Sequence, residues 1–258
     1  AALGPGLPLS APELFQVYGR SPGPDAPELL SRPNGPLPSV GSLLLSARLD
    51  DESGRSVSAD GRYVAFVSAS PVFGSAAVSQ VLRRDLLTGE TVVVSRAAGP
   101  GGALADAEAD SPVISADWRR VSFRSSATNL HPDDPTNDGD VFVRDVVTGE
   151  LFLATRSDGA AGASPLGGTQ GGELAAGGGH VVFEATATTL VSGDTNAKRD
   201  VFVRDLATGT TSLVSRGDGP AGALGNGDSR SGDISADGSV VAFETSASNF
   251  GDGDATTG

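Results

Sequence analysis

The feature that most constrains this chain is a repeat with a period of about 60 residues. The segment DVFVRDVVTGE at 140–150 returns as DVFVRDLATGT at 200–210, and a looser copy, QVLRRDLLTGE, occupies 80–90. A fixed period of this length predicts a fold assembled from repeated supersecondary units. The aspartates that mark the period are Asp85, Asp145 and Asp205.

A second recurring piece precedes each of these segments. Asp-Gly pairs such as Asp60-Gly61 favour a tight hairpin because both central positions tolerate positive φ. The Thr-Gly pairs after VFVRD, such as Thr148-Gly149, predict a second hairpin. Each unit should therefore have four antiparallel strands, of which the third is apolar on both faces, as in a strand buried between sheets. The copies of this piece are VSADGRYVAFVSAS (57–70), ISADWRRVSFRSSA (114–127), AAGGGHVVFEATA (175–187) and ISADGSVVAFETSA (234–247).

The first and last units of the sequence are half units. ELFQVYG (13–19) and LLSR (29–32) occupy the places of a third and a fourth strand, whereas 229–250 contain a first and a second strand. Four-stranded antiparallel units repeated radially form a β-propeller, in which closure protects the sheet edges. We therefore predict an all-β, four-bladed β-propeller whose N-terminal strands complete the last blade. A fragment of a six- to eight-bladed ring and a stacked solenoid are the alternatives.

The predicted boundaries follow from this alignment, within a single domain over 1–258. They are 1–12 for an extended tail, 13–35 for the closing half-blade, 55–96, 111–156 and 172–216 for the blades, and 229–250 for the half-blade that the N terminus completes.

Composition excludes several classes of function. The formal net charge is -14, and nucleic acids and anionic membranes both select for basic patches, so neither is expected as a partner. The chain has no cysteine, which excludes disulfides and thiol chemistry. No apolar run approaches the roughly 18 residues of a membrane span. The opening AALGPG, without Met, fits a processed export product or a trimmed chain.

The loops after the second strand are rich in oxygen ligands. The segments 131–140, 191–200 and 251–256 align so that their aspartates recur at 60-residue steps. Hard cations such as Ca²⁺ prefer clustered carboxylate and amide oxygens on short loops. The alternative is that these aspartates cap turns by accepting backbone N–H bonds. The candidate Ca²⁺ ligands are Asp134, Asp140, Asp194, Asn196, Asp200 and Asp254.

No catalytic residue is assigned from the sequence. His131 and His180, the only histidines, belong to no triad or metal-ligand spacing. The Arg-Asp pair at the end of each third strand, such as Arg84-Asp85, recurs in three units, so we expect a structural role as an ion pair between blades or a turn cap. Trp118 stands where other units have Gly in the first turn. It is either an exposed partner-binding residue or a cover for its own blade.

The motifs ISADGxxVAF, NL…D and DVFVRDxxTGxTxxVSR together resemble the WD40-like PD40 repeats of TolB-like propellers, over about 13–254. The resemblance implies a binding platform that is secreted, periplasmic or on the cell surface. Departures from the pattern are Trp118, the run Gly177-Gly178-Gly179, and a period longer than the roughly 40–45 residues usual for propeller repeats.

Two functional expectations follow. The first is a non-enzymatic scaffold that binds a protein partner or associates with itself as a homo-oligomer, with Ca²⁺ as a possible aid. The alternative is a ligand-binding or enzymatic propeller with its site in the central channel, for which His131, His180, Glu184 and Trp118 are the nominated residues.

Overall fold

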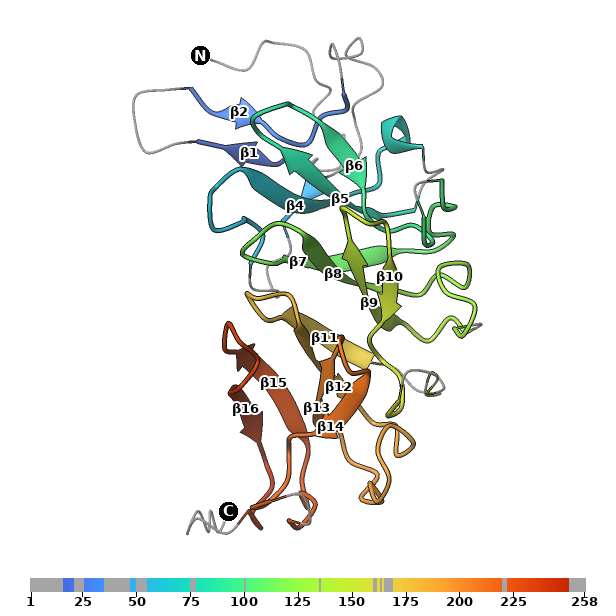
Figure 1. Cartoon of the computed structure of the whole chain (residues 1–258), viewed down its shortest axis with the longest axis vertical. Coiled ribbons are helices and arrows are strands. Elements are labelled where there is room, and N and C mark those ends of the chain that lie inside the picture. The colour runs from blue at the N-terminus through green and yellow to red at the C-terminus, as the bar shows by residue number, and fades with distance from the viewer. Residues whose placement is uncertain are drawn as a thin grey trace, which may run out of the picture.

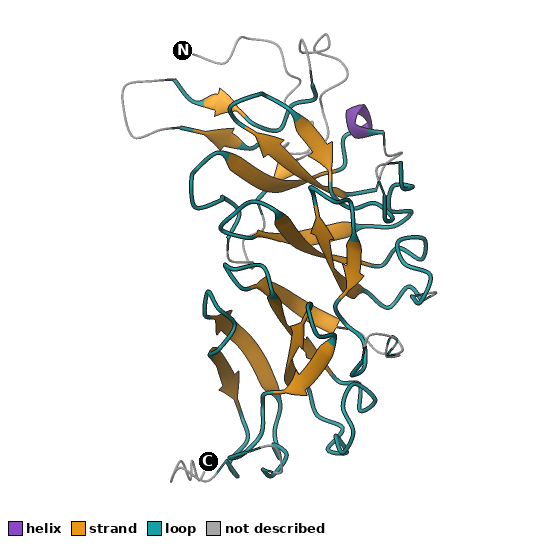
Figure 2. Ribbon diagram, viewed as in Figure 1, coloured by secondary structure: helices purple, strands orange, loops and turns teal. Residues whose placement is uncertain are grey.

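In the computed structural model, the described residues are all-β apart from one short 3-10 helix, η1 (Pro71–Phe73). They form three four-stranded and two two-stranded antiparallel sheets, stacked face to face along the molecule (Figures 1 and 2). Among the described residues, there is no helix of the length and apolar character that spanning a bilayer requires. The described residues are 16–20, 26–34, 47–49, 55–74, 78–99, 101–134, 136–159, 162, 164, 169–219 and 222–250.

Each four-stranded sheet is a meander, called a blade below, in which strands pair in chain order. Blade 1 contains β3 (Ala47–Arg48), β4 (Tyr63–Ser68), β5 (Gln80–Asp85) and β6 (Thr91–Val93). Blade 2 contains β7 (Ala109–Ile114), β8 (Arg120–Ser125), β9 (Asp140–Asp145) and β10 (Leu151–Leu153). Blade 3 contains β11 (Thr169–Leu174), β12 (His180–Ala185), β13 (Asp200–Asp205) and β14 (Thr210–Leu213). The N-terminal half-blade is β1 (Tyr18–Gly19) and β2 (Glu28–Leu29), and the C-terminal half-blade is β15 (Ser229–Ile234) and β16 (Val241–Thr245).

The hairpins fall where the repeat predicts them. In the first turn of each unit the equivalent residue has positive φ, and in blade 2 that residue is Trp118. The Thr-Gly turns also have positive φ at glycine, for example 76° at Gly149. The blades begin earlier than the repeat predicts, at Ala47, Ala109 and Thr169 rather than at 55, 111 and 172. The difference is largest in blade 1, where the first strand is split into β3 and a separate bridge from Val57 to Val64.

The core lies between adjacent sheets. All six residues of β9 are buried, as predicted for a third strand with two apolar faces. The rings of Phe123 and Phe142 stack with centroids 5.6 Å apart, and those of Phe183 and Phe202 repeat the contact at 5.7 Å. Burying such a side chain contributes about 1.5–3 kcal/mol, so these cross-strand pairs stabilise the centres of blades 2 and 3.

Arginines at the end of the third strand join neighbouring blades. Arg144 donates hydrogen bonds to the carbonyls of Arg96 and Ala97, each at 2.9 Å, and of Gly99 at 3.0 Å, all in the loop after blade 1. Arg204 reaches the loop after blade 2 in the same way. The aspartate that follows each arginine caps its own turn instead. The predicted turn cap is therefore confirmed for the aspartates. The arginines Arg144 and Arg204 join the blades through backbone carbonyls rather than through the predicted ion pair.

The predicted closure of the ring is not formed. The two half-blades are separate sheets and lie at opposite ends of the stack, with β1–β2 beyond blade 1 and β15–β16 beyond blade 3 (Figure 1). The N-terminal half-blade is held in this place by its contacts with blade 1, described below. Four blades in a closed ring are thus not confirmed, whereas the blade-like antiparallel units are.

Candidate functional site

The N-terminal half-blade reproduces the third and fourth strands of a blade. The carbonyl of Val17 accepts from the N–H groups of Leu30 at 2.8 Å and Ser31 at 3.4 Å. Val81 accepts from its two counterparts at the same distances. Ser31 Oγ donates to Gln16 Oε1 at 2.8 Å, as Ser95 Oγ donates to Gln80. Tyr18 therefore corresponds to Phe142 and Phe202, the third-strand halves of the stacked aromatic pairs.

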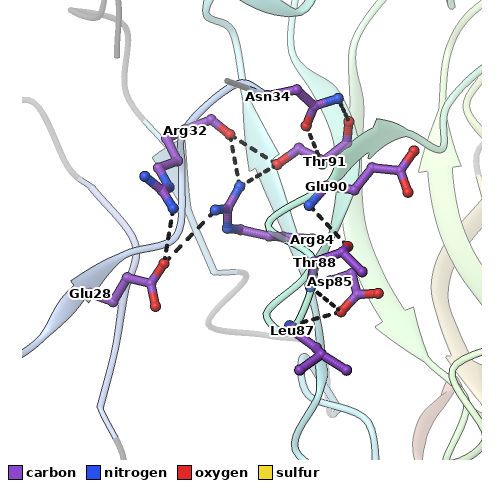
Figure 3. Close-up of polar contacts among 9 residues, drawn as sticks. All are labelled: Glu28, Arg32, Asn34, Arg84, Asp85, Leu87, Thr88, Glu90 and Thr91. Atoms are coloured by element: carbon purple, nitrogen blue, oxygen red, sulfur yellow. Dashed lines mark hydrogen bonds and ion pairs between the residues drawn. The ribbon is translucent and has the colours of Figure 1, made fainter. Parts of the chain in front are cut away.

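This half-blade packs on blade 1 through the same kind of contact that joins complete blades (Figure 3). The buried Arg84 guanidinium approaches the carbonyl of Arg32 at 3.4 Å, and the Thr91 hydroxyl donates to the same carbonyl at 2.9 Å. Asn34 exchanges two hydrogen bonds with the backbone of Thr91. Glu28 lies 3.9 Å from Arg84. The half-blade thus occupies the position of a blade that precedes blade 1.

Among the described strands, none pairs with the outer edge of the C-terminal half-blade. β16 pairs with β15 alone among the described strands, whereas the equivalent β12 pairs on both sides. Phe243 is partly buried, although its counterparts Phe123 and Phe183 are fully buried. At the other end of the stack, Tyr18 is 56% exposed. Sequence analysis missed Tyr18 and Phe243; the alignment of FQVYG with VFVRD was the available signal.

The acidic loop of blade 2 brings Asp134 and Asp140 together in a buried setting. Asp134 accepts from the N–H and the hydroxyl of Thr136, and Asp140 accepts from Thr155 and Ser164. Burial raises the pKa of Asp140 to about 7. The hydrogen bond from Thr155 opposes this rise, and the charge of Asp134 adds to it. Two ionised carboxylates are therefore disfavoured here.

The acidic loop of blade 3 holds the equivalent pair, with Asp200 0% and Asp194 5% exposed. Asp200 accepts a hydrogen bond from the hydroxyl of Ser215 at 2.6 Å. Burial, and after it the charge of Asp200, raises the pKa of Asp194. Asn196 donates from Nδ2 to the carbonyl of Gly225 at 3.1 Å. Asp254, the remaining predicted ligand, lies outside the described residues.

Trp118 packs on the neighbouring blade. Its indole stacks on Tyr63 of blade 1, with centroids 4.7 Å apart, and the guanidinium of Arg83 lies over both rings. The side chain is half-buried, so part of it stays accessible to a partner. Its prediction as a partner-binding residue remains a prediction.

The residues nominated for a channel site take part in separate contacts. His131 lies 3.8 Å from Asp133, which pairs with Arg156 at 3.0 Å. In blade 3, His180 lies 4.0 Å from Asp205, and Glu184 pairs with Arg199. These contacts are ion pairs and place no base beside a nucleophile. Within the described residues, no three His, Cys, Asp or Glu side chains converge as metal ligands.

A groove of about 290 Å³ opens between the outer parts of blades 1 and 2. Arg83, Arg96 and Arg144 contribute to its lining, together with Glu90 and apolar residues. Two of these arginines are already engaged within the protein, since Arg96 donates to the carbonyl of Gly102 in its own loop and Arg144 joins blade 2 to the loop after blade 1.

Comparisons with known proteins describe the shape alone. The chain is similar to TolB-type structures from Agrobacterium tumefaciens (16% identity, 72% of this chain and 51% of that chain, TM-score 0.41) and Acinetobacter baumannii (16%, 72% and 36%, 0.42). It is also similar to the β-propeller domain of the Trilobed protease from Pyrococcus furiosus (13%, 64% and 41%, 0.38). The chain thus spans about half or less of each of these proteins. No family model and no curated protein matches it, so the resemblance to PD40 repeats is not confirmed.

Proposed function

We propose that this chain is a non-enzymatic interaction module that associates with further copies of itself through its two half-blades. The observation that carries the proposal is their complementarity. The open edge of β16 belongs to a second strand, and the strand that pairs with a second strand in every complete blade is a third strand. β1 is of that third-strand type. Each end of the molecule therefore presents what the other end lacks.

The side chains at the two ends match in register. Phe123 pairs directly across from Phe142, and Phe183 from Phe202. The same register places Tyr18 opposite Phe243 in a composite blade. An unpaired strand edge readily accepts another strand, and a stacked aromatic pair adds about 0.5–1.5 kcal/mol beyond the area it buries. Joining the two halves would thus complete both the hydrogen-bond ladder and the aromatic core.

A second copy is favoured over closure within one chain because of where the half-blades lie. Three packed sheets separate them (Figure 1), so closure would require every junction between blades to change. A second copy can dock end to end while those junctions stay intact. Such heterologous contacts form a ring if the rotation closes and a filament if it does not.

Light scattering across protein concentrations tests this proposal. The full chain should pass from monomer to dimer and longer species as concentration rises. Tyr18→Ser should leave a folded monomer, because an exposed side chain is changed. The matched control is Val147→Ser, which changes a 58% exposed residue in the turn of blade 2 and should associate like the wild type. A wild type that stays monomeric at every concentration would reject the proposal.

Cross-linking separates the two ways of joining the ends. The chain has no cysteine, so Arg20→Cys with Val241→Cys introduces the only thiols and leaves Tyr18 and Phe243 intact. The same register places these two positions opposite each other, as it does Arg204 and Val181 in blade 3. A short bismaleimide should join these thiols between chains and give a ladder of multimers. A cross-link confined to single chains would show ring closure and overturn association between copies.

The setting of this module is also proposed. The resemblance to exported propeller repeats supports a secreted, periplasmic or cell-surface location. Fractionation of cells that produce the native protein would test it, and a protein confined to the cytoplasm would contradict it.

A further inference from the structure

The side chain at the start of each third strand makes an equivalent hydrogen bond in every blade. Its oxygen accepts a hydrogen bond from the hydroxyl that follows the fourth strand: Gln80 from Ser95 at 2.6 Å and Asp200 from Ser215 at 2.6 Å. Gln16 makes the same contact in the N-terminal half-blade. This contact fixes the carboxamide or carboxylate, so the second terminal atom of each side chain points to an equivalent place in its blade.

In blade 1 the second terminal atom is the amide nitrogen of Gln80, and it has a hydrogen-bond acceptor. Gln80 Nε2 donates at 3.0 Å to the carbonyl of Ala105, in the connection that leads to the next blade. A neutral amide therefore fills the interior of this loop without any ligand. The residue equivalent to Ala105 in blade 3 is Gly225, whose carbonyl accepts from Asn196.

Blade 3 has an oxygen where blade 1 has this donor. Asp200 Oδ2 and Asp194 Oδ1 are both fully buried and have no hydrogen-bond partner among the described residues. Neither carboxylate takes part in an ion pair within the described part of the chain, where the adjacent Arg199 is directed to Glu184 instead. Burying a carboxylate without a compensating charge is costly, and two side by side are costlier.

We propose that a divalent cation of the Ca²⁺ class binds between Asp194 and Asp200 in blade 3. The ligands are the oxygens of the two carboxylates. Asn196 is engaged beside them: its Oδ1 accepts from the N–H of Lys198, and its Nδ2 donates to the carbonyl of Gly225 in the connection after blade 3. Hard cations take such oxygen sets and complete them with water. Neither histidine of the chain lies in this loop, which disfavours zinc and similar metals. In blade 3 the cation would balance the charge of the two carboxylates. Blade 1 needs no cation, because Gln80 is neutral and its amide N–H donates to a carbonyl.

Equilibrium dialysis of the EDTA-treated full chain against radioactive Ca²⁺ tests the site. Asp200→Gln installs the residue that blade 1 uses, so it should fold and should bind one equivalent of Ca²⁺ fewer than the wild type. Asp194→Asn, which keeps the side-chain shape, should lose the same equivalent. The matched control is Asp218→Asn, an exposed acid in the loop after blade 3, which should bind like the wild type.

Thermal unfolding gives a second readout. Ca²⁺ should raise the melting temperature of the wild type, since a ligand that binds only the folded state stabilises it, and the rise should shrink in both site variants. The proposal is overturned if the wild type binds no Ca²⁺ at millimolar concentration, or if both variants bind as much as the wild type. These measurements use the monomer at low concentration, so they stand apart from the test of association.

Discussion

Trp118 lies in the left-handed region of the backbone (φ 62°), where the equivalent turns have glycine. A residue with a Cβ atom loses about 1–2 kcal/mol there, and the indole offsets this by stacking on Tyr63 beneath Arg83. The position of Trp118 in the turn could be predicted from the repeat. Its contact with blade 1 could not, because a sequence period places residues within a unit and leaves contacts between units open.

Two substitutions of Trp118 should separate these effects. Both lose the aromatic stack, but Trp118→Ala keeps the left-handed strain and Trp118→Gly relieves it. We therefore expect the alanine variant to be less stable than the glycine variant by about 1 kcal/mol, measured by urea unfolding followed by circular dichroism.

The same pair of substitutions at Val240 is the control. Val240 is 64% exposed and does not have positive φ, so alanine should be the more stable variant there. Equal stabilities of the two Trp118 variants would show that the turn is not strained.

At the scale of the element, the hairpin between the third and fourth strands has a built-in cap. In blade 1, Arg62 donates two hydrogen bonds to Asp85, at 2.9 and 2.6 Å, and the N–H groups of Leu87 and Thr88 donate to the same carboxylate. Arg62 first, and then these N–H groups, hold the pKa of Asp85 well below its ordinary value. The Asp and Thr-Gly pattern made the hairpin predictable, whereas β3 escaped prediction because its Ala47-Arg48 has no copy in other units.

This cap predicts a loss of stability in acid. A carboxyl group whose pKa is lowered by folding stabilises the protein above its unfolded pKa, about 3.9, and that stabilisation disappears as pH falls toward the folded value. The free energy of unfolding should therefore decline below about pH 4. Asp85→Asn should lower stability at pH 7 and make the acid decline shallower, as urea titrations at pH 7, 4 and 3 would show. Asp218→Asn should leave the decline unchanged, and a decline that Asp85→Asn did not alter would contradict the assignment.

At the scale of the whole molecule, stability should decrease from the central blades toward the ends. The strands of blade 2 are covered by a sheet on each face, whereas β16 has an open edge. The repeat predicted the number of strands in each unit. It could not predict closure, because the rotation between blades is set by side-chain packing at each junction. At the first junction, for example, Arg84 contacts Arg32 and Asn34 contacts Thr91.

Amide hydrogen exchange should report this gradient. The N–H groups of β9 should exchange slowest, and those of Val241 and Phe243, on the side of β16 that faces away from β15, should exchange within the fastest class at low protein concentration. If copies join through the half-blades, these two amides should become protected as concentration rises, while those of β9 stay unchanged. Protection of Val241 that did not depend on concentration would argue against the open edge.

A line of backbone hydrogen bonds links the first turns of successive units. The N–H of Ala59 donates to the carbonyl of Ala116 at 3.0 Å, that of Ala116 to Ala176 at 2.8 Å, and that of Gly177 to Ala236 at 2.7 Å. Because no side chain takes part in these bonds, each link forms whatever residue follows in the turn, whether tryptophan or glycine. A duplication or deletion of one whole 60-residue unit would therefore leave this line of bonds unbroken. The number of units could therefore change while the same backbone hydrogen bonds connect neighbouring first turns.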